Sequence, residues 1–168
     1  MNNSAVNTTL LFITVLLVQV LVCNHINFLG YINPYVYILF IMLFPIRTNR
    51  TVIIILGFLL GLCVDFFSDS GGVHAAAAVT IAYIRPVLLK FSFGMIYEHQ
   101  SIKFSNTELG NRLIYISLFI VIHHFVLFSL EVFNISKIIL ILQKTLFSSI
   151  FTIILCFMST ILFSKKRR

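Results

Sequence analysis

Long, nearly uninterrupted apolar runs are the feature of this sequence that most limits its fold. Residues 10–22 form one such run, and others of similar or greater length follow at short intervals. Hydrophobic residues make up 60% of the chain and charged residues only 10%, whereas soluble domains carry about 25% charged residues. A soluble domain of this length would leave roughly a third of its unfolded surface in water. The sequence therefore excludes a soluble enzyme, a disordered chain and a nucleic-acid-binding domain, and it predicts an integral membrane protein.

Six apolar segments are expected to form membrane helices. None of them alternates polar and apolar residues as barrel strands do, so helices are the spanning structure that satisfies their backbone groups. The second segment makes a helix of only about 20 Å, against a hydrocarbon core of roughly 30 Å. In this segment Pro34 suits the first helical turn and Asn33 the cap before it. We expect one all-α domain over residues 1–168, with six transmembrane helices at 7–23, 34–46, 51–68, 73–90, 111–133 and 136–163.

The basic residues predict the orientation of these segments, because cytoplasmic loops of membrane proteins are rich in Lys and Arg. With six spans and a cytoplasmic C-terminus, ten of the twelve Lys and Arg residues fall on the cytoplasmic side, and only Lys137 and Lys144 fall near the outer face. The net charge of +7 is therefore a topology signal. If the short second segment is re-entrant, only the N-terminus changes sides. We favour six spans with both ends inside.

Small residues at helical spacing predict a close-packed hairpin of the third and fourth segments. Residues four apart share a helix face, and two such series occur: Gly57, Gly61 and Asp65, then His74, Ala78 and Ala82. The antiparallel register sets Gly61 level with Ala78. It likewise sets Gly57 level with Ala82. Small residues that face each other let membrane helices approach closely, so packing is the main role expected for this stretch.

Asp65 and His74 are expected at similar depth near the outer end of this hairpin. Ionisable side chains in a membrane segment are costly and often functional. These two are placed to hydrogen-bond across the hairpin and to shape the surface that a partner meets; the alternative is that each faces water separately. Arg85 is expected to extend to the cytoplasmic headgroups as an anchor at a helix end. Pro86 removes a helix hydrogen bond and predicts a kink.

A second polar group lies in the fifth segment, where His123 and His124 fall in the middle of the membrane and Glu131 shares a helix face with His124. A metal site needs a third ligand and a proton relay needs further acids, so interhelical hydrogen bonds are the favoured interpretation. Glu131 is expected to pair with Lys137 or Lys144. The sequence contains no catalytic motif and no phosphate-binding loop. We therefore expect no enzymatic activity, no cofactor and no metal.

The turn between the third and fourth segments resembles the signature of a known family. Gly61-Leu-Cys-Val-Asp65-Phe-Phe-Ser, followed by Gly72-Val-His74-Ala, is similar to the pattern of the bacterial rod shape-determining MreD family. Chain length, number of segments and basic ends agree with this family over the whole sequence. Ile84-Arg85-Pro86 and the run from His123 to Glu131 resemble versions from its Bacteroidetes branch.

The resemblance implies a non-enzymatic scaffold of cell elongation and peptidoglycan synthesis in the bacterial cytoplasmic membrane. Members associate with MreC, and through it with MreB and with the RodA glycosyltransferase and its penicillin-binding partner. The resemblance therefore implies these partners and the lipid bilayer, but no nucleic acid. Gly61, Asp65, Gly72 and His74 match the motif, and we expect them to serve packing or partner contact.

The resemblance also implies a fold similar to the substrate-binding subunits of energy-coupling-factor vitamin transporters. The alternative function is accordingly that of a subunit binding a small molecule such as a vitamin. Such a subunit needs a pocket with several converging polar groups. The sequence shows few of these groups and only short outer loops, which favours the scaffold.

Overall fold

A computed structural model describes residues 3–26, 32–46, 48–94 and 107–164 of the chain. The described residues form six α-helices and two short 3-10 helices. In chain order these are α1 (Asn3–Leu21), η1 (Cys23–His25), α2 (Ile38–Leu43), α3 (Arg50–Ser68), α4 (Val73–Phe93), α6 (Leu109–Val132), η3 (Ile135–Lys137) and α7 (Ile138–Ser164). The expected all-α architecture is confirmed over these ranges.

Five of the helices are long and apolar enough to cross a membrane, namely α1, α3, α4, α6 and α7. Large apolar side chains lie exposed along them, among them Phe66 on α3, Phe91 on α4 and Ile139 on α7. Water would penalise such a surface and lipid does not, because acyl chains are as apolar as these side chains. The helices are consistent with a multi-pass membrane protein.

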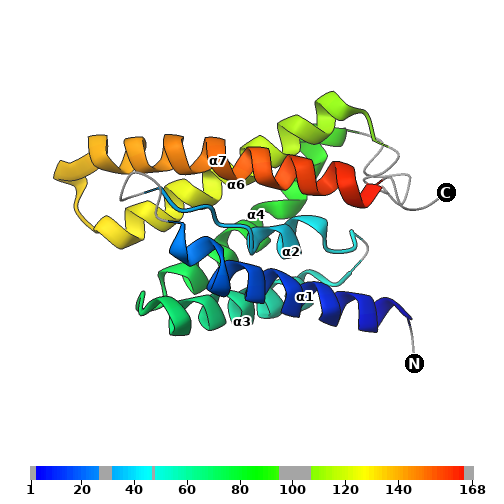
Figure 1. Ribbon diagram of the computed structural model, residues 1–168. Coiled ribbons are helices and arrows are strands. Elements are labelled where there is room, and N and C mark those ends of the chain that lie inside the picture. Colours follow the sequence, from blue (N-terminus) through cyan, green and yellow to red (C-terminus); the bar gives the residue numbers. More distant parts are fainter. Residues whose placement is uncertain (1–2, 27–31, 47, 95–106, 165–168) are drawn as a thin grey trace.

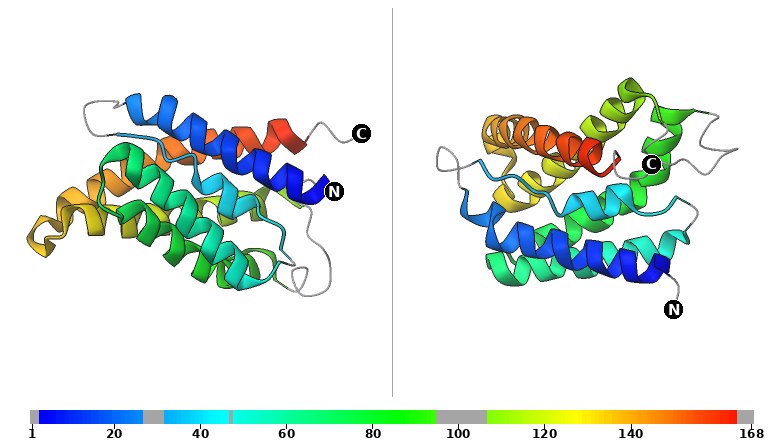
Figure 2. Two further views of the ribbon diagram at one scale, coloured as in Figure 1. Left: turned by 90° about the horizontal axis from the view of Figure 1, so that it is seen from below. Right: turned by 45° about the vertical axis from the view of Figure 1, so that its right-hand side comes forward.

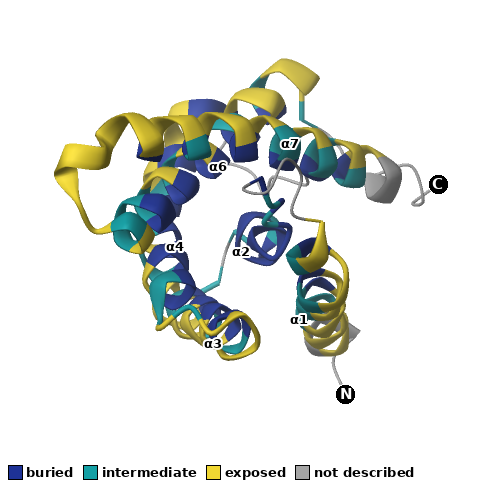
Figure 3. Cartoon of the chain, turned by 60° about the vertical axis from the view of Figure 1, so that its left-hand side comes forward, coloured by how far each residue is buried: buried dark blue, intermediate teal, exposed yellow. Residues whose placement is uncertain are grey.

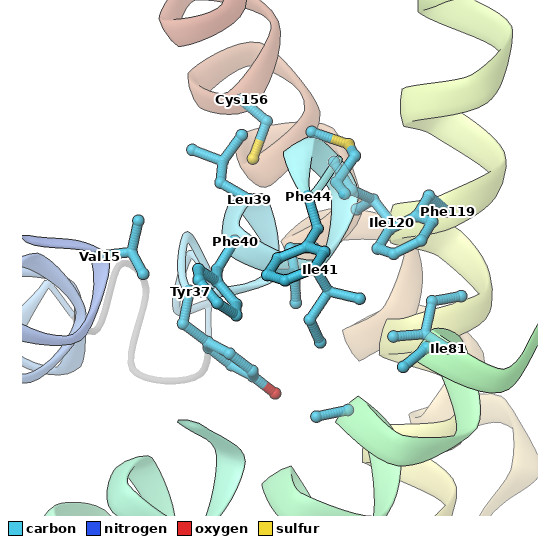
Figure 4. Packing of buried hydrophobic residues seen from close by; sticks show 14 of the residues in the cluster. Val15, Tyr37, Leu39, Phe40, Ile41, Phe44, Ile81, Phe119, Ile120 and Cys156 are labelled. Carbon is cyan, nitrogen blue, oxygen red and sulfur yellow. The ribbon is translucent and has the colours of Figure 1, made fainter. Parts of the chain in front are cut away.

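The long helices surround the short one. Helix α3 packs on α4, α4 on α6 and α6 on α7, while α1 packs on α3. Figure 3 shows these five helices around α2, which lies at the centre of the bundle. The residues of α2 from Ile38 to Met42 are all buried. Figure 4 shows side chains of α2 among Val15 of α1, Ile81 of α4, Ile120 of α6 and Cys156 of α7.

The segment that carries α2 returns the chain along the bundle. Helices α1 and α3 run in the same direction, so residues 32–46 must run in the opposite one (Figure 1). The start of α1 and the end of α7 consequently lie at the same end of the bundle (Figures 1 and 2). Five of the six expected transmembrane helices are therefore found in the described residues. In place of the sixth, residues 32–46 pass back along the bundle with only a short helix, and we call this segment the second pass.

The expected helix at 34–46 is wrong at its beginning. The helix starts at Ile38, with Tyr37 as its N-cap and no side-chain cap, so neither Asn33 nor Pro34 begins it. It ends at Leu43, where the following Phe44 adopts an extended backbone with ψ 144°. A helix of this length is far too short to cross a membrane.

Basic residues gather at one end of the bundle. Arg50 begins α3, Lys90 lies in the last turn of α4, and Arg112 lies in the first turn of α6. Lys137 and Lys144 lie at the opposite end, in η3 and the start of α7. Arg85, also expected near the cytoplasmic face, is buried in α4. The other six basic residues expected there fall outside the described ranges: Arg47, Lys103, Lys165, Lys166, Arg167 and Arg168.

Candidate functional site

Asp65 closes the α3–α4 hairpin by capping the start of α4. Its Oδ1 accepts hydrogen bonds from the backbone N–H of His74 at 3.0 Å and from the Ser70 hydroxyl at 2.6 Å. Its Oδ2 accepts from the backbone N–H of Ala75 at 2.8 Å. The N-cap residue Gly72 has no side chain for this role, so the carboxylate supplies the missing acceptor and lies at the positive end of the helix dipole. Asp65 and His74 therefore hydrogen-bond across the hairpin, as expected, and the donor is the backbone N–H of His74.

Gly61 is required where the two helices touch. A Cβ added there would lie 2.6 Å from Ala75 Cα and 2.7 Å from the carbonyl oxygen of His74. Gly61 thus meets Ala75, almost one turn closer to the hairpin end than the Ala78 expected. Gly57 does face Ala82, because its added Cβ would lie 3.6 Å from Ala82 Cβ. Both helices approach at van der Waals distance, as small residues permit.

The turn itself needs backbone conformations that side chains disfavour. Gly71 has φ 66° and Gly72 has φ 95°, both in the left-handed region that glycine adopts without strain. Asp69 ends α3 in the same region, with φ 51°, which Asp tolerates better than most residues. The glycines of this turn are therefore explained by geometry alone.

The ring of His74 turns inward and joins a buried polar group built around Tyr37. The Tyr37 hydroxyl shares a hydrogen bond of 2.7 Å with His123 Nε2 and lies 3.5 Å from His74 Nδ1. Tyr37 and His123 are fully buried, and His74 is 5% exposed. One hydroxyl from the second pass thus links α4 to α6.

His124 makes a separate set of contacts. Its Nδ1 lies 2.7 Å from the carbonyl oxygen of Ile120, and its Nε2 lies 3.3 Å from the hydroxyl of Thr152 on α7. The same hydroxyl accepts a hydrogen bond from the backbone N–H of Tyr35 at 3.2 Å. Both histidines therefore take part in hydrogen bonds between separate segments of the bundle.

Glu131 lies apart from the two histidines. Its Oε1 accepts a hydrogen bond from Lys144 Nζ at 2.8 Å, and this ion pair joins α6 to α7 at the partly exposed end of the bundle. Of the two partners expected for Glu131, the structure shows Lys144.

The second pass depends on polar side chains from its neighbours. Gln19 Oε1 accepts hydrogen bonds from the backbone N–H groups of Val36 at 2.8 Å and Tyr37 at 3.3 Å, and its Nε2 donates to the carbonyl of Pro34 at 3.2 Å. Gln19 is fully buried. Sequence reasoning missed it, although an amide inside the first apolar run was a usable signal.

Arg85 holds the other end of the second pass. Its Nη2 donates to the carbonyl oxygens of Met42 and Phe44, at the C-terminus of α2, and the Tyr115 hydroxyl also donates to Met42. Arg85 is only 5% exposed, so it is not the outward anchor expected from the sequence. A cation stabilises the negative end of a helix. Helix α4 continues through Pro86 to Phe93.

A polar cavity of about 540 Å³ lies at the hairpin end of the bundle. It opens between η1, the start of the second pass, the α3–α4 turn and the end of α6. His74 and Glu131, from separate helices, both line it. The polar residues that converge here include Asn24, His25, Asn33, Tyr35, His74 and Glu131. More polar groups therefore meet at this end than their spacing in the sequence suggests.

These side chains form hydrogen bonds between helices and line a cavity. Within the described ranges, no three His, Cys, Asp or Glu residues lie close enough together to hold a metal ion. Cys23, Cys63 and Cys156 are free thiols. Comparison with protein-family models, with curated proteins and with solved structures finds no match to this chain.

Proposed function

We propose that this protein is a non-enzymatic scaffold of the bacterial cell-elongation complex in the cytoplasmic membrane, with its C-terminus in the cytoplasm. Its proposed direct partner is MreC, with MreB and RodA and its penicillin-binding protein reached indirectly. The observation that carries the proposal is the role of the motif positions. Gly61 permits the closest approach of the two helices, Asp65 caps α4, and Gly72 allows the turn.

A hairpin held in this way presents a rigid outer face to other membrane proteins. Phe58, Leu62 and Phe66 lie exposed along α3 on that face. Membrane helices associate through close packing of preformed surfaces, and preorganised surfaces lose less conformational entropy on binding. The proposal therefore rests on shape at the hairpin and needs no chemistry from the protein.

Co-purification tests this proposal. The full chain is coexpressed with the single-span protein MreC, and MreC recovered with the wild type is compared with that recovered with Asp65→Asn. We expect the wild type to retain MreC and Asp65→Asn to retain several-fold less. Asp69→Asn is the matched control, because it removes an exposed acid four residues away. The scaffold proposal fails if the wild type retains no MreC. It also fails if a folded Asp65→Asn protein retains MreC at the level of the control.

One observation favours a second candidate function. The cavity at the hairpin end is within the range of roughly 300–1,000 Å³ that small-molecule sites occupy, and several polar groups converge on it. We therefore keep as the alternative a vitamin-binding transporter subunit, with a fold similar to those of energy-coupling-factor systems.

Mass spectrometry of the purified protein separates the two functions. A transport subunit is expected to release a bound metabolite when denatured, and Glu131→Gln is expected to release less of it because Glu131 lines the cavity. Glu108→Gln is the control, since Glu108 precedes α6 at the opposite end. An empty cavity together with retained MreC supports the scaffold.

A further inference from the structure

A second cavity, of about 160 Å³, lies at the basic end of the bundle. It is bounded by α3, by α4 and by the chain that follows α2. The residues that line it include Ile46, Thr48, Arg50, Ala82, Arg85 and Pro86. Among the described residues that line it, the charged ones are Arg50 and Arg85, and none is a carboxylate. A cavity with this lining favours an anion.

Arg85, which lines this cavity, carries an unused hydrogen-bond donor. Its Nη2 is occupied by the carbonyls at the end of α2, but its buried Nε has no hydrogen-bond partner. A buried donor without an acceptor is unfavourable, and it is more so on a charged group. An oxygen anion in the cavity is the kind of acceptor that satisfies such a group, since guanidinium groups bind phosphate with several N–H donors.

Arg50 is held at the rim of the same cavity by Tyr83. Its guanidinium carbon lies 3.9 Å from the centre of the Tyr83 ring, and its Nη2 donates to the Tyr83 carbonyl at 2.6 Å. Both residues are exposed. Arg50 is the first residue of α3, so the mouth of the cavity lies beside the start of that helix. The end of a membrane-spanning helix is the part that lies nearest the lipid headgroups.

We propose that this cavity binds the phosphate of an anionic phospholipid. The cavity is formed where α3 begins, and the positive end of that helix dipole also favours an anion. Val52 and Ile55 follow Arg50 as exposed apolar residues of α3. They provide a surface along which the acyl chains of a bound lipid pack, whereas a free phosphate ion leaves this surface unused. Basic pockets between membrane helices bind acidic headgroups for the same electrostatic reason.

Native mass spectrometry of the full-length protein in detergent tests the proposal. Phosphatidylglycerol and phosphatidylcholine are titrated separately, and the fraction of lipid-bound protein is measured. We expect the wild type to bind phosphatidylglycerol at least fivefold more tightly, which corresponds to about one favourable cation near the headgroup. Arg50→Gln is expected to abolish this preference. Lys137→Gln is the matched control, because it removes an exposed cation at the other end of the bundle and is expected to retain the preference.

Two further measurements keep the test decisive. Thr48→Phe retains both arginines and fills the cavity, so it is also expected to weaken the binding of phosphatidylglycerol. Millimolar inorganic phosphate is added as a competitor and is not expected to displace the lipid. The proposal is overturned if Arg50→Gln and Lys137→Gln lose the preference equally, if Thr48→Phe binds as the wild type does, or if phosphate alone displaces the lipid. The test does not depend on the scaffold function, since no MreC is present.

Discussion

The α3–α4 hairpin and the second pass of the chain are in contact, yet they are held in different ways. In the hairpin both partners are continuous helices, and small residues such as Gly61 let their backbones meet. In the second pass only residues 38–43 are α-helical. Several backbone groups before and at the end of this helix bond to side chains from other helices, namely Gln19, Arg85 and Thr152.

The difference follows from the environment. A continuous helix satisfies its own backbone hydrogen bonds, so within a bilayer it needs only a complementary shape beside it. An interrupted segment leaves N–H and C=O groups without partners, and neither lipid nor apolar side chains supply any. The second pass must therefore lie at the centre of the bundle, where polar side chains from several helices reach it.

The largest loss of stability is expected from removing the Gln19 amide, which hydrogen-bonds to the backbone of the second pass. Gln19→Leu leaves the N–H groups of Val36 and Tyr37 and the carbonyl of Pro34 without their partner. We expect the free energy of unfolding in detergent to fall by about 3 kcal/mol or more, because each buried unpaired group costs about 1–3 kcal/mol. Gln143→Leu is the control, since Gln143 is exposed on α7. Equal stability of the two variants would mean that Gln19 does not support the second pass.

The α3–α4 hairpin is expected to lose stability when a larger side chain is placed between its helices. Gly61→Ala places a Cβ at 2.6 Å from Ala75 Cα, and backbone on the facing helix cannot move aside easily. Overpacking of this kind costs about 1–3 kcal/mol, and we expect a loss near 2 kcal/mol in the same unfolding measurement. Gly57→Ala meets the flexible end of Ile41 at 3.3 Å and is expected to lose clearly less. If the order of the two variants is reversed, the packing account of the hairpin is wrong.

A smaller effect is expected where the two regions meet. Tyr37→Phe removes the hydroxyl that bonds to His123 Nε2 at 2.7 Å and keeps the ring. We expect a loss of about 1 kcal/mol in the free energy of unfolding, which is typical of one buried hydrogen bond. Tyr83→Phe, on the exposed face of α4, is the control and is expected to lose almost nothing. If Tyr37→Phe instead raises the free energy of unfolding, the buried hydroxyl destabilises the folded protein.

The smallest effect is expected at the ion pair between α6 and α7. Lys144→Met removes the partner of Glu131, and the two side chains are 20% and 42% exposed. Partly exposed ion pairs contribute about 0–1 kcal/mol, so the midpoint of thermal unfolding is expected to change little. Raised salt is expected to reduce even this difference, because it screens exposed charges. A large loss would mean that these helices are held by charge and not by packing.

Particular helices show how far the sequence predicts the structure. The third segment was expected at 51–68 and is found at Arg50–Ser68, and the fourth was expected at 73–90 and is found at Val73–Phe93. These helices are long apolar runs bounded by polar or glycine-rich turns, so their bounds depend on local signals. The start of α2 was missed because it depends on Gln19, which lies far from it in sequence.

The candidate site residues also differ in how far local sequence predicts them. Spacing of four identified Gly57, Gly61 and Asp65 as one helix face, and all three are buried. The direction of Arg85 was not predictable, since a long cationic side chain on a helix reaches inward or outward with equal ease. Only the carbonyls left free at the end of α2 decide that it points inward.

The sequence predicts a bundle of apolar helices, and it places the ends of five of them to within four residues. It also predicts at which end of the bundle the basic residues gather. These properties follow from local composition and periodicity. Only the folded structure shows the path of the second pass, the inward direction of Arg85 and the cavities at opposite ends of the bundle. Each of these depends on backbone or charged groups that must find partners on distant segments, and a bilayer offers no water to take their place.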